Sequence, residues 1–407
     1  FSLKYLDENK SEASNTKPET NSKPFSNFKF RISNSKRKNL IFFSIFTLLA
    51  TPQAYAAHLW YPFFGVFSLF LTTYVILNSP ALSKAEGFQD LEGSRNKFGM
   101  TKRAITLVII TLLVNSFWLL PNLYYIFTSS NVPKESKQNR IFSQEYRLRN
   151  QENGYIQDVA ITKGFYFQWS AYSFEKNKFE YLMPEWREHI SNPLVQSIGY
   201  IFFGFSLGGL FLAFKRRQKT LLSFAPFVII PFIFLMNHTP PFSWLYNYLL
   251  NFSLFEEAVR FIFTKLSILL VFGYTVFLSY FLLWLFDAVK SRKRSLILST
   301  LYLLLIITYA FPLFRGHLIS DKFKVKVPDQ YFQLWNYMKT QPNETVLTLP
   351  LHTFSGWQYY KWGYQGSGFI WFGMKQPVLD RDSDRWSIAN EQAFRELQYT
   401  LYSQRLE

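Results

Sequence analysis

Long stretches without charge alternate with polar blocks along this chain. No Asp, Glu, Lys or Arg occurs in six stretches, namely 40–83, 104–132, 190–214, 220–255, 266–286 and 295–314. Because a helix that crosses ~30 Å of hydrocarbon needs about 20 residues, each stretch can hold one span and the first can hold two. The pattern predicts seven transmembrane helices, at about 40–56, 58–78, 104–125, 193–214, 220–236, 262–287 and 295–313. Pro52 and Gln53 shorten the apolar core of the first helix, so a re-entrant segment is the alternative there.

Basic residues distinguish the two sides of the predicted membrane. The loops 1–39, 79–103, 215–219 and 288–294 hold 22 Lys and Arg against 8 Asp and Glu, counting Asp287 at the edge. The alternate loops, 126–192, 237–261 and 314–407, hold 21 Lys and Arg against 19 Asp and Glu. Cytoplasmic loops carry the excess of Lys and Arg in multi-pass membrane proteins. We therefore predict a plasma (inner) membrane protein with a cytoplasmic N-terminus and an extracytoplasmic C-terminus.

The composition narrows the class of protein further. Apolar residues make up 49% of the 407 positions and aromatic residues 20%, which is too hydrophobic for a disordered chain. The net charge of +17 would ordinarily suggest nucleic-acid binding, but the surplus lies at membrane ends, as in Lys215-Arg216-Arg217, where it sets orientation. We expect a lipid bilayer and no nucleic acid as partner. The sequence has no cysteine, which excludes thiol catalysis and Cys-ligated zinc.

The expected fold class is an all-α polytopic membrane protein with a long outer loop and an α+β domain on the outer side. Its parts are a cytoplasmic loop (1–39), three transmembrane helices (40–125), an extracytoplasmic loop subdomain (126–192), four further helices (193–313) and a C-terminal extracytoplasmic domain (314–407). In the last part, 328–340 and 390–402 have helical periodicity, and 346–350 alternates like a strand. A first residue other than Met and a helix-like stretch that runs to residue 407 indicate a fragment.

Charged residues gather at the mouth of the predicted helix 262–287. Glu256, Glu257, Arg260 and Lys265 lie within or beside an otherwise apolar segment. Ionisable groups at membrane depth are costly, so they usually face a cavity or pair with one another. Arg260 and Lys265 could bind a phosphate head group, because Arg and Lys side chains suit its oxygens. The alternative is a surface ion pair between Glu256 and Arg260, with Lys265 extended to the interface.

Aromatic residues and one histidine form a second group of candidates. His238 is a candidate general base, although a His before Thr-Pro-Pro more often caps a turn. Trp169, Trp357 and Trp362 lie in aromatic-rich stretches of the two outer segments. Such stretches either pack inside their own domain or stack on the apolar faces of sugars, and nothing local separates the two interpretations.

A calcium loop is the one metal site that the spacing suggests. Asp380, Asp382, Asp384 and Glu391 follow the calcium-loop pattern, but Arg385 occupies the sixth position, where such loops need Gly for a sharp turn. We therefore expect no metal ion and no cofactor.

Four motifs occur together in a fixed order. They are Asn115-Ser116-Phe117-Trp118-Leu119-Leu120-Pro121, an aromatic loop ending in Ser191-Asn192-Pro193, Pro-Pro-Phe…Val-Arg-Phe-Ile-Phe-Thr-Lys within 240–265, and Leu-Thr-Leu-Pro…Gly-Trp…Trp-Gly-Tyr-Gln-Gly within 347–366. From about residue 40 onward the chain resembles the alpha-(1→3)-arabinofuranosyltransferase family, within the GT-C glycosyltransferase superfamily.

The resemblance implies an enzyme that transfers a sugar from a polyprenyl-phosphate donor to a cell-envelope glycan acceptor on the outer face of the membrane. It also implies a catalytic carboxylate in the first outer loop, which we expect upstream of Phe1, because no acidic residue separates the first two spans. Arg260 and Lys265 match the Arg…Lys pair of the family's loop and would contact the donor phosphate.

The remaining candidates have supporting roles in this interpretation. Glu256, Glu257 and His238 are the weaker candidates for catalysis, and Trp169, Trp357 and Trp362 would line the acceptor path. The alternative function is non-catalytic, either in envelope assembly or in transport of a lipid-linked glycan. A transporter would place its charges near the bilayer midplane, whereas here they lie at the predicted outer mouth.

Overall fold

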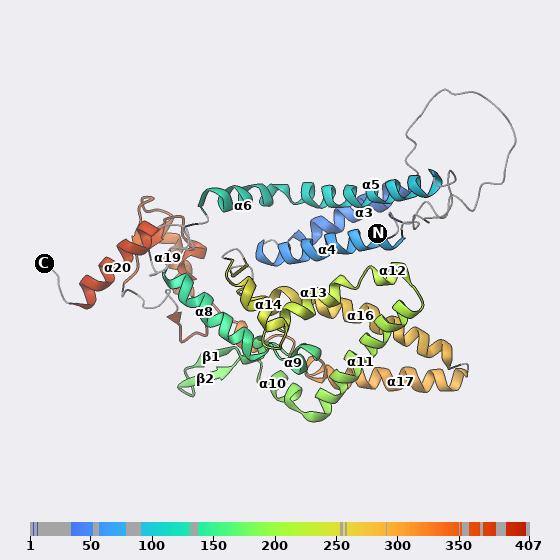
Figure 1. Ribbon diagram of the computed structural model, residues 1–407. Coiled ribbons are helices and arrows are strands. Elements are labelled where there is room, and N and C mark those ends of the chain that lie inside the picture. The colour runs from blue at the N-terminus through green and yellow to red at the C-terminus, as the bar shows by residue number, and fades with distance from the viewer. Residues whose placement is uncertain are drawn as a thin grey trace, which may run out of the picture. The chain divides into compact units, whose positions relative to one another are not determined.

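The structure is a computed structural model of the chain (Figure 1). It describes residues 3, 6, 34–51, 57–78, 91–129, 131, 137–252, 255–256, 259–289, 291–349, 351, 358–366, 369–379 and 388–403. Most of these residues are helical. The chain forms two compact units, which are described separately. The first unit is Phe1–Phe127, Ser206–Phe232 and Thr264–Leu282, and the second is Thr128–Phe205, Ile233–Phe263 and Leu283–Glu407.

Three of the predicted transmembrane helices are present at full length. They are α4 (Ala57–Asn78), α11 (Pro193–Lys215) and α16 (Ile262–Ala288), which are long and apolar enough to cross a membrane. These helices also expose large apolar side chains such as Ile76, Phe211 and Ile268. Such exposure is unfavourable in water but suits a hydrocarbon environment. The apolar helices thus indicate a membrane protein.

The predicted span 104–125 is broken rather than continuous. Helices α5 (Leu91–Val114) and α6 (Ser116–Ser129) meet at Asn115 with a bend of 80°. The buried Asn115 side chain donates to the carbonyl of Thr111 (2.8 Å) and accepts from the indole of Trp118 (2.9 Å). An Asn side chain that bonds the local backbone in this way competes with the helix ladder. Counted as one broken span, the pair raises the number of candidate spans among the described residues from three to four.

The other three predicted spans are helical but are not confirmed as spans. Helix α3 (Asn34–Leu49) has 16 residues, which is short for a span. The first turn of α17 (Arg292–Tyr309) contains three basic residues, so its apolar part is shorter than the helix. The stretch 220–236 divides into α12 (Lys219–Leu222) and α13 (Pro226–Leu235), because Pro226 lacks the N–H group that would continue the first helix. Taken together, Lys219–Leu235 form an apolar helix of fewer than 18 residues, which is short for crossing the hydrocarbon.

The first unit is a layer of apolar helices with an aromatic core. Within it, α4 packs against α5 and α12, and α3 packs against α5 (Figure 1). Its fully buried side chains include Leu71, Tyr74 and Leu107. Helices α11 and α16 approach closely in this unit, because Ser206 donates to the carbonyl of Tyr274 (3.2 Å). Gly209 presents no side chain at the same contact.

The second unit begins with the segment predicted as an extracytoplasmic loop. That segment folds into α8 (Lys137–Glu152), α9 (Ile156–Ala160), the short helix η2 (Phe165–Gln168), strands β1 (Ser170–Ser173) and β2 (Lys178–Tyr181), and α10 (Pro184–Ser191). The strands pair in antiparallel fashion with Ser170 opposite Tyr181 and Ser173 opposite Lys178. Helices α14 (Phe242–Leu249) and α18 (Phe311–Phe314) belong to the same unit.

The C-terminal part of the second unit combines helices with very short strands. It contains η3 (Asp321–Phe323), α19 (Asp329–Met338), β3 (Val346–Leu347), β4 (Gln358–Tyr359), β5 (Gln365–Gly366), η4 (Phe369–Gly373), β6 (Val378–Leu379) and α20 (Ile388–Tyr402). Helices α19 and α20 confirm the predicted helices 328–340 and 390–402. The predicted strand 346–350 is reduced to β3, which pairs in parallel with β6. Since this part shares a compact unit with 128–205, a separate α+β domain stays a prediction.

Contacts join loops that the charge balance predicts to lie on the same side of the membrane. In the first unit, Arg103 donates to the carbonyl of Leu6 (2.7 Å), and both residues belong to basic loops. In the second unit, Arg147 lies 3.8 Å from Glu256, and Trp186 donates to the carbonyl of His317 (2.6 Å). The loop 126–192 thus contacts both other loops with balanced charge. Which set of loops faces the cytoplasm stays a prediction.

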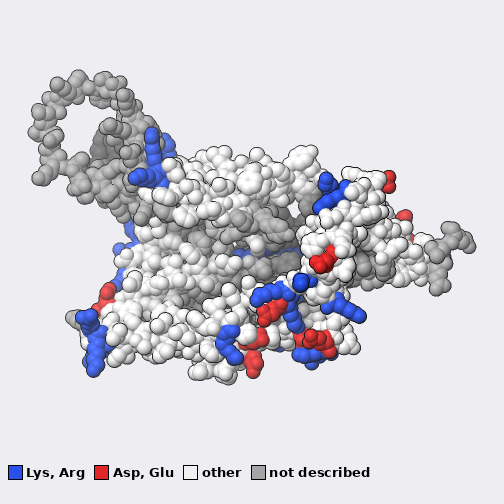
Figure 2. Space-filling model, turned by 180° about the vertical axis from the view of Figure 1, so that it is seen from behind, with Lys and Arg blue, Asp and Glu red and all other residues white. Residues whose placement is uncertain are grey.

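Charged side chains occupy separate groups on the molecular surface. Figure 2 shows broad uncharged areas between small groups of Lys, Arg, Asp and Glu. Many exposed apolar residues belong to helices α3, α4, α11, α16 and α17. An apolar patch of this extent is rare on a soluble monomer and marks a surface that meets lipid or another protein.

Candidate functional site

An apolar groove in the first unit contains Lys265. Its volume is ≈ 560 Å³, and its lining comes from Leu3, α4, the residues around α13 and the first half of α16. Lys265 is 5% exposed and is the only charged residue among the described residues that line the groove. The remaining lining is aliphatic or aromatic except for Thr264. The groove therefore combines a long apolar wall with a single positive charge.

Helical spacing explains the apolar wall. On α4, Phe63, Phe67 and Phe70 follow one another at intervals of four and three residues, so their rings stack on one face. Phe224 approaches Phe70 at 4.8 Å between ring centroids, and Phe227 approaches Phe272 of α16 at 5.1 Å. These contacts bring three helical segments together around the groove.

Lys265 lies in the first turn of α16, at the positive end of the helix dipole. Both the ammonium group and the dipole favour a negative group at this point. The groove is therefore suited to an amphipathic anion with a hydrocarbon tail.

Arg260 lies in the second unit, in the segment that precedes α16. It is 8% exposed, and its guanidinium lies over the ring of Phe261 at 5.4 Å. The backbone carbonyl of Arg260 accepts a hydrogen bond from the Asn150 side chain (3.0 Å). Tyr146 packs on Phe261 at 4.3 Å between ring centroids. Contacts from α8 thus fix the backbone around Arg260.

Helix α8 and the turn that follows it contact residues near both ends of the segment 237–260. Arg147 forms an ion pair with Glu256, and Asn150 bonds the carbonyls of Val259 and Arg260. One turn later, the carbonyl of Gly154 accepts from the His238 backbone N–H (3.2 Å) and from the Thr239 hydroxyl (3.1 Å). Arg147 and Asn150 lie three residues apart and share one side of α8, whereas Gly154 follows the end of the helix at Glu152. These residues are not among those predicted from the sequence, where no motif marks them.

Buried polar atoms lie close to this contact. Among the described residues, no hydrogen-bond partner is present for both amide atoms of Asn237, the Asn150 amide oxygen or the Tyr246 hydroxyl. Burial raises the pKa of Tyr246 to about 12, so its hydroxyl stays protonated and can donate a hydrogen bond. Buried polar groups normally have partners, and those that lack one in a folded protein are suited to hold water or a ligand.

The candidate general acids and bases lie in different surroundings. Glu256 forms an ion pair with Arg147. The alternative interpretation of the sequence predicts an ion pair between Glu256 and Arg260 instead. His238 is exposed, and its ring packs on Tyr155 at 4.4 Å between centroids. Its backbone rather than its ring makes the turn contact with Gly154. Glu257 lies outside the described residues.

Two of the predicted sugar-contacting tryptophans, Trp169 and Trp362, are among the described residues. Trp169 is 39% exposed and lies just before β1. Trp362 packs within an aromatic cluster of the C-terminal part, where Phe369 approaches at 4.8 Å and Tyr364 at 5.6 Å between ring centroids. Trp357 lies outside the described residues. For Trp362 the structure favours packing inside its own segment.

Metal ligation has no support in the part of the chain that is described. No group of three or more His, Asp or Glu side chains there is arranged to hold a metal ion. Asp380, Asp382 and Asp384 lie outside the described residues, and Glu391 forms an ion pair with Arg395 (2.5 Å).

Comparisons with protein-family models, with curated proteins and with solved structures found no match. The resemblance to the arabinofuranosyltransferase family therefore depends on the sequence motifs alone.

Proposed function

We propose that the chain is part of a membrane glycosyltransferase that uses a polyprenyl-phosphate sugar donor. The observation that carries the proposal is the apolar groove lined by Lys265. Its volume of ≈ 560 Å³ lies within the ~300–1,000 Å³ typical of small-molecule sites. In the proposal, the isoprene units nearest the phosphate lie along the phenylalanines, and the Lys265 ammonium group contacts the phosphate.

The remaining roles follow from the chemistry of glycosyl transfer. As the bond between sugar and phosphate breaks, negative charge grows on the departing phosphate, and nearby cations stabilise it. Arg260 is proposed as a phosphate contact on the sequence motif alone, because it matches the Arg of the family's loop and its planar fork bonds two oxygens at once. Glu256 or Glu257 would position these cations or accept the proton of the acceptor hydroxyl. The acceptor is a cell-envelope glycan on the outer face of the membrane.

Lipid binding gives the first test. With purified full chain in nanodiscs, we expect Lys265→Ala to weaken binding of polyprenyl phosphate about tenfold or more, since a hydrogen bond to a charged group is worth ~1.5–3 kcal/mol. Binding of the corresponding polyprenol, which has no phosphate, should not change. Lys219→Ala is the matched control, because Lys219 is exposed in α12. Equal loss for both lipids, or no loss for either, contradicts the role of Lys265.

Sugar transfer gives the second test. In membranes that contain the complete enzyme, we expect Arg260→Ala and Lys265→Ala each to lower the transfer rate by at least ~100-fold, because each removes a charge that stabilises the leaving phosphate. The amount of protein in the membrane is measured in parallel. If both variants retain transfer, the two residues are not part of the site. If a lipid-linked glycan crosses the bilayer without transfer, the transporter alternative holds.

A further inference from the structure

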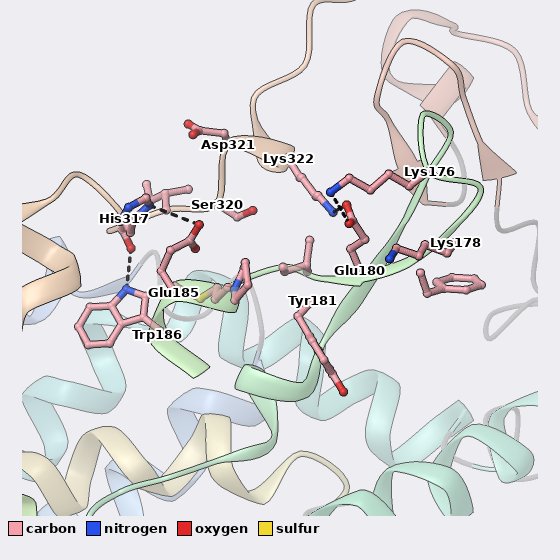
Figure 3. A pocket seen from close by; sticks show the side chains of 15 residues that line it. Lys176, Lys178, Glu180, Tyr181, Glu185, Trp186, His317, Ser320, Asp321 and Lys322 are labelled. Atoms are coloured by element: carbon pink, nitrogen blue, oxygen red, sulfur yellow. Dashed lines mark hydrogen bonds and ion pairs between the residues drawn. The ribbon is translucent and has the colours of Figure 1, made fainter. Parts of the chain in front are cut away.

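A cleft with charged and aromatic lining lies in the second unit, and neither Arg260 nor Lys265 lines it. One wall is formed by the β1–β2 hairpin and the start of α10, and the other by the segment 317–322 after α18 (Figure 3). Its volume is ≈ 580 Å³, again within the range of small-molecule sites. Both walls belong to loops that the charge balance predicts to be extracytoplasmic.

Glu180 stands between two lysines in this cleft. Its carboxylate lies 2.8 Å from Lys176 Nζ and 3.3 Å from Lys322 Nζ, and Figure 3 shows both side chains pointing toward it. The hydrogen bond from Lys176 lowers the pKa of Glu180, and Lys322 lowers it further. The Glu180 side chain therefore stays ionised and is held by the two lysines, and its remaining lone pairs can accept hydrogen bonds.

A second polar group lies farther along the cleft. The Glu185 carboxylate lies 3.9 Å from Nδ1 of His317, and the Trp186 indole holds the backbone carbonyl of His317 at 2.6 Å. Glu185 is also half-exposed. Since 3.9 Å is too long for a hydrogen bond, both side chains keep capacity for an external partner.

Lys178 adds a donor at the Glu180 end of the cleft (Figure 3). It is exposed on β2, and within the described residues it forms no ion pair. Lysine supplies three N–H donors and no acceptor, whereas the carboxylates of Glu180 and Glu185 supply only acceptors. The cleft therefore offers donors and acceptors side by side.

The charge balance selects the class of ligand. Lys176, Lys178 and Lys322 are matched by three carboxylates, those of Glu180, Glu185 and Asp321. A phosphate or other anion would meet those carboxylates, so the cleft has no surplus charge to attract it. A neutral sugar presents hydroxyl groups that each donate and accept, and its C–H faces suit exposed rings such as Phe179 at 58% exposure.

We propose that this cleft binds a short neutral oligosaccharide, with Glu180 and Glu185 as acceptors and Lys178 as donor. The inference does not depend on the glycosyl transfer proposed above, because it assigns a binding site and no reaction. A protein that binds saccharides here without transferring them would still satisfy it.

Titration calorimetry on the full chain tests the inference. The probes are neutral trisaccharides of glucose, galactose, mannose and arabinose, with inorganic phosphate in a separate titration. The detergent must have no sugar head group, since a glycoside detergent would compete for the cleft. We expect at least one trisaccharide to bind and phosphate not to bind. Lys178→Ala and Glu185→Gln should each weaken that binding roughly tenfold, the cost of one hydrogen bond to a charged group.

Three variants separate loss of binding from loss of structure. Lys178→Ala removes no ion pair among the described residues, so its effect does not arise from opening the cleft. Glu175→Gln changes a carboxylate in the β1–β2 turn that does not line the cleft, and it should bind as the original chain does. Lys265→Ala should also bind saccharide unchanged. The inference is overturned if no trisaccharide binds, if phosphate binds instead, or if Lys178→Ala and Glu185→Gln bind as tightly as Glu175→Gln.

Discussion

Replacing Gly209 with alanine is expected to destabilise the protein by about 2 kcal/mol or more, because no space exists for a side chain there. A Cβ atom at this position would overlap the backbone oxygen of Phe277 and lie 2.6 Å from its carbonyl carbon. Backbone atoms of a helix cannot rotate away, so α11 and α16 would have to separate within the first unit. That movement would also break the hydrogen bond from Ser206 to Tyr274. Small residues at helix crossings stabilise membrane proteins through such close approach.

Gly204 on the same helix is the matched control. A Cβ atom there meets nothing within 4 Å. Gly204→Ala should therefore change stability by no more than ~0.5 kcal/mol. The measurement is the thermal unfolding midpoint of each variant in the same detergent. Equal midpoints for the two variants would show that α11 and α16 do not pack as described.

Replacing Gly154 with alanine should release the start of the segment 237–260 from the turn that follows α8. The added Cβ atom would overlap the amide oxygen of Asn237 and lie 2.8 Å from the backbone nitrogen of His238. The backbone hydrogen bond from His238 to Gly154 would be lost, together with the bond from the Thr239 hydroxyl. Overpacking of this kind costs about 1–3 kcal/mol, which is enough to open a local segment.

Limited proteolysis measures that release. We expect cleavage within 237–260 to become at least tenfold faster in Gly154→Ala, while cleavage elsewhere keeps its rate. Gly65→Ala serves as the control, because a Cβ atom at Gly65 meets nothing within 4 Å. An unchanged cleavage pattern in Gly154→Ala would show that the contact at Gly154 does not hold the segment in place.

The sequence predicted helices correctly where apolar residues run without interruption. The spans 58–78, 193–214 and 262–287 have no strong local competitor for the helical backbone, and each is found nearly to the residue. The spans 104–125 and 220–236 are broken by single features. Asn115 bonds its own backbone in the first, and Pro226 starts a new helix in the second. Average hydropathy does not detect such local effects.

The candidate site could be predicted only in part, for a different reason. Lys265 was identifiable because a charge inside an apolar stretch is conspicuous in any sequence. Its apolar partners on α4 lie some 200 positions earlier, and the face of α8 that contacts Arg260 lies more than 100 positions earlier. Periodicity identifies a face but not the segment that covers it. The cleft beside Glu180 likewise depends on a contact with Lys322 that no local pattern indicates.

The central claim is that the loops 126–192 and 314–407 lie outside the membrane and the basic loops inside. Because the chain has no cysteine, single cysteines can be introduced and labelled without background. We predict that cysteines at positions 175 and 361, in intact cells, react with a membrane-impermeant maleimide. Cysteines at 217 and 293 should react only after the membrane is permeabilised. Labelling of position 217 or 293 in intact cells, or protection of 175 and 361, would contradict the proposed topology and the donor site that depends on it.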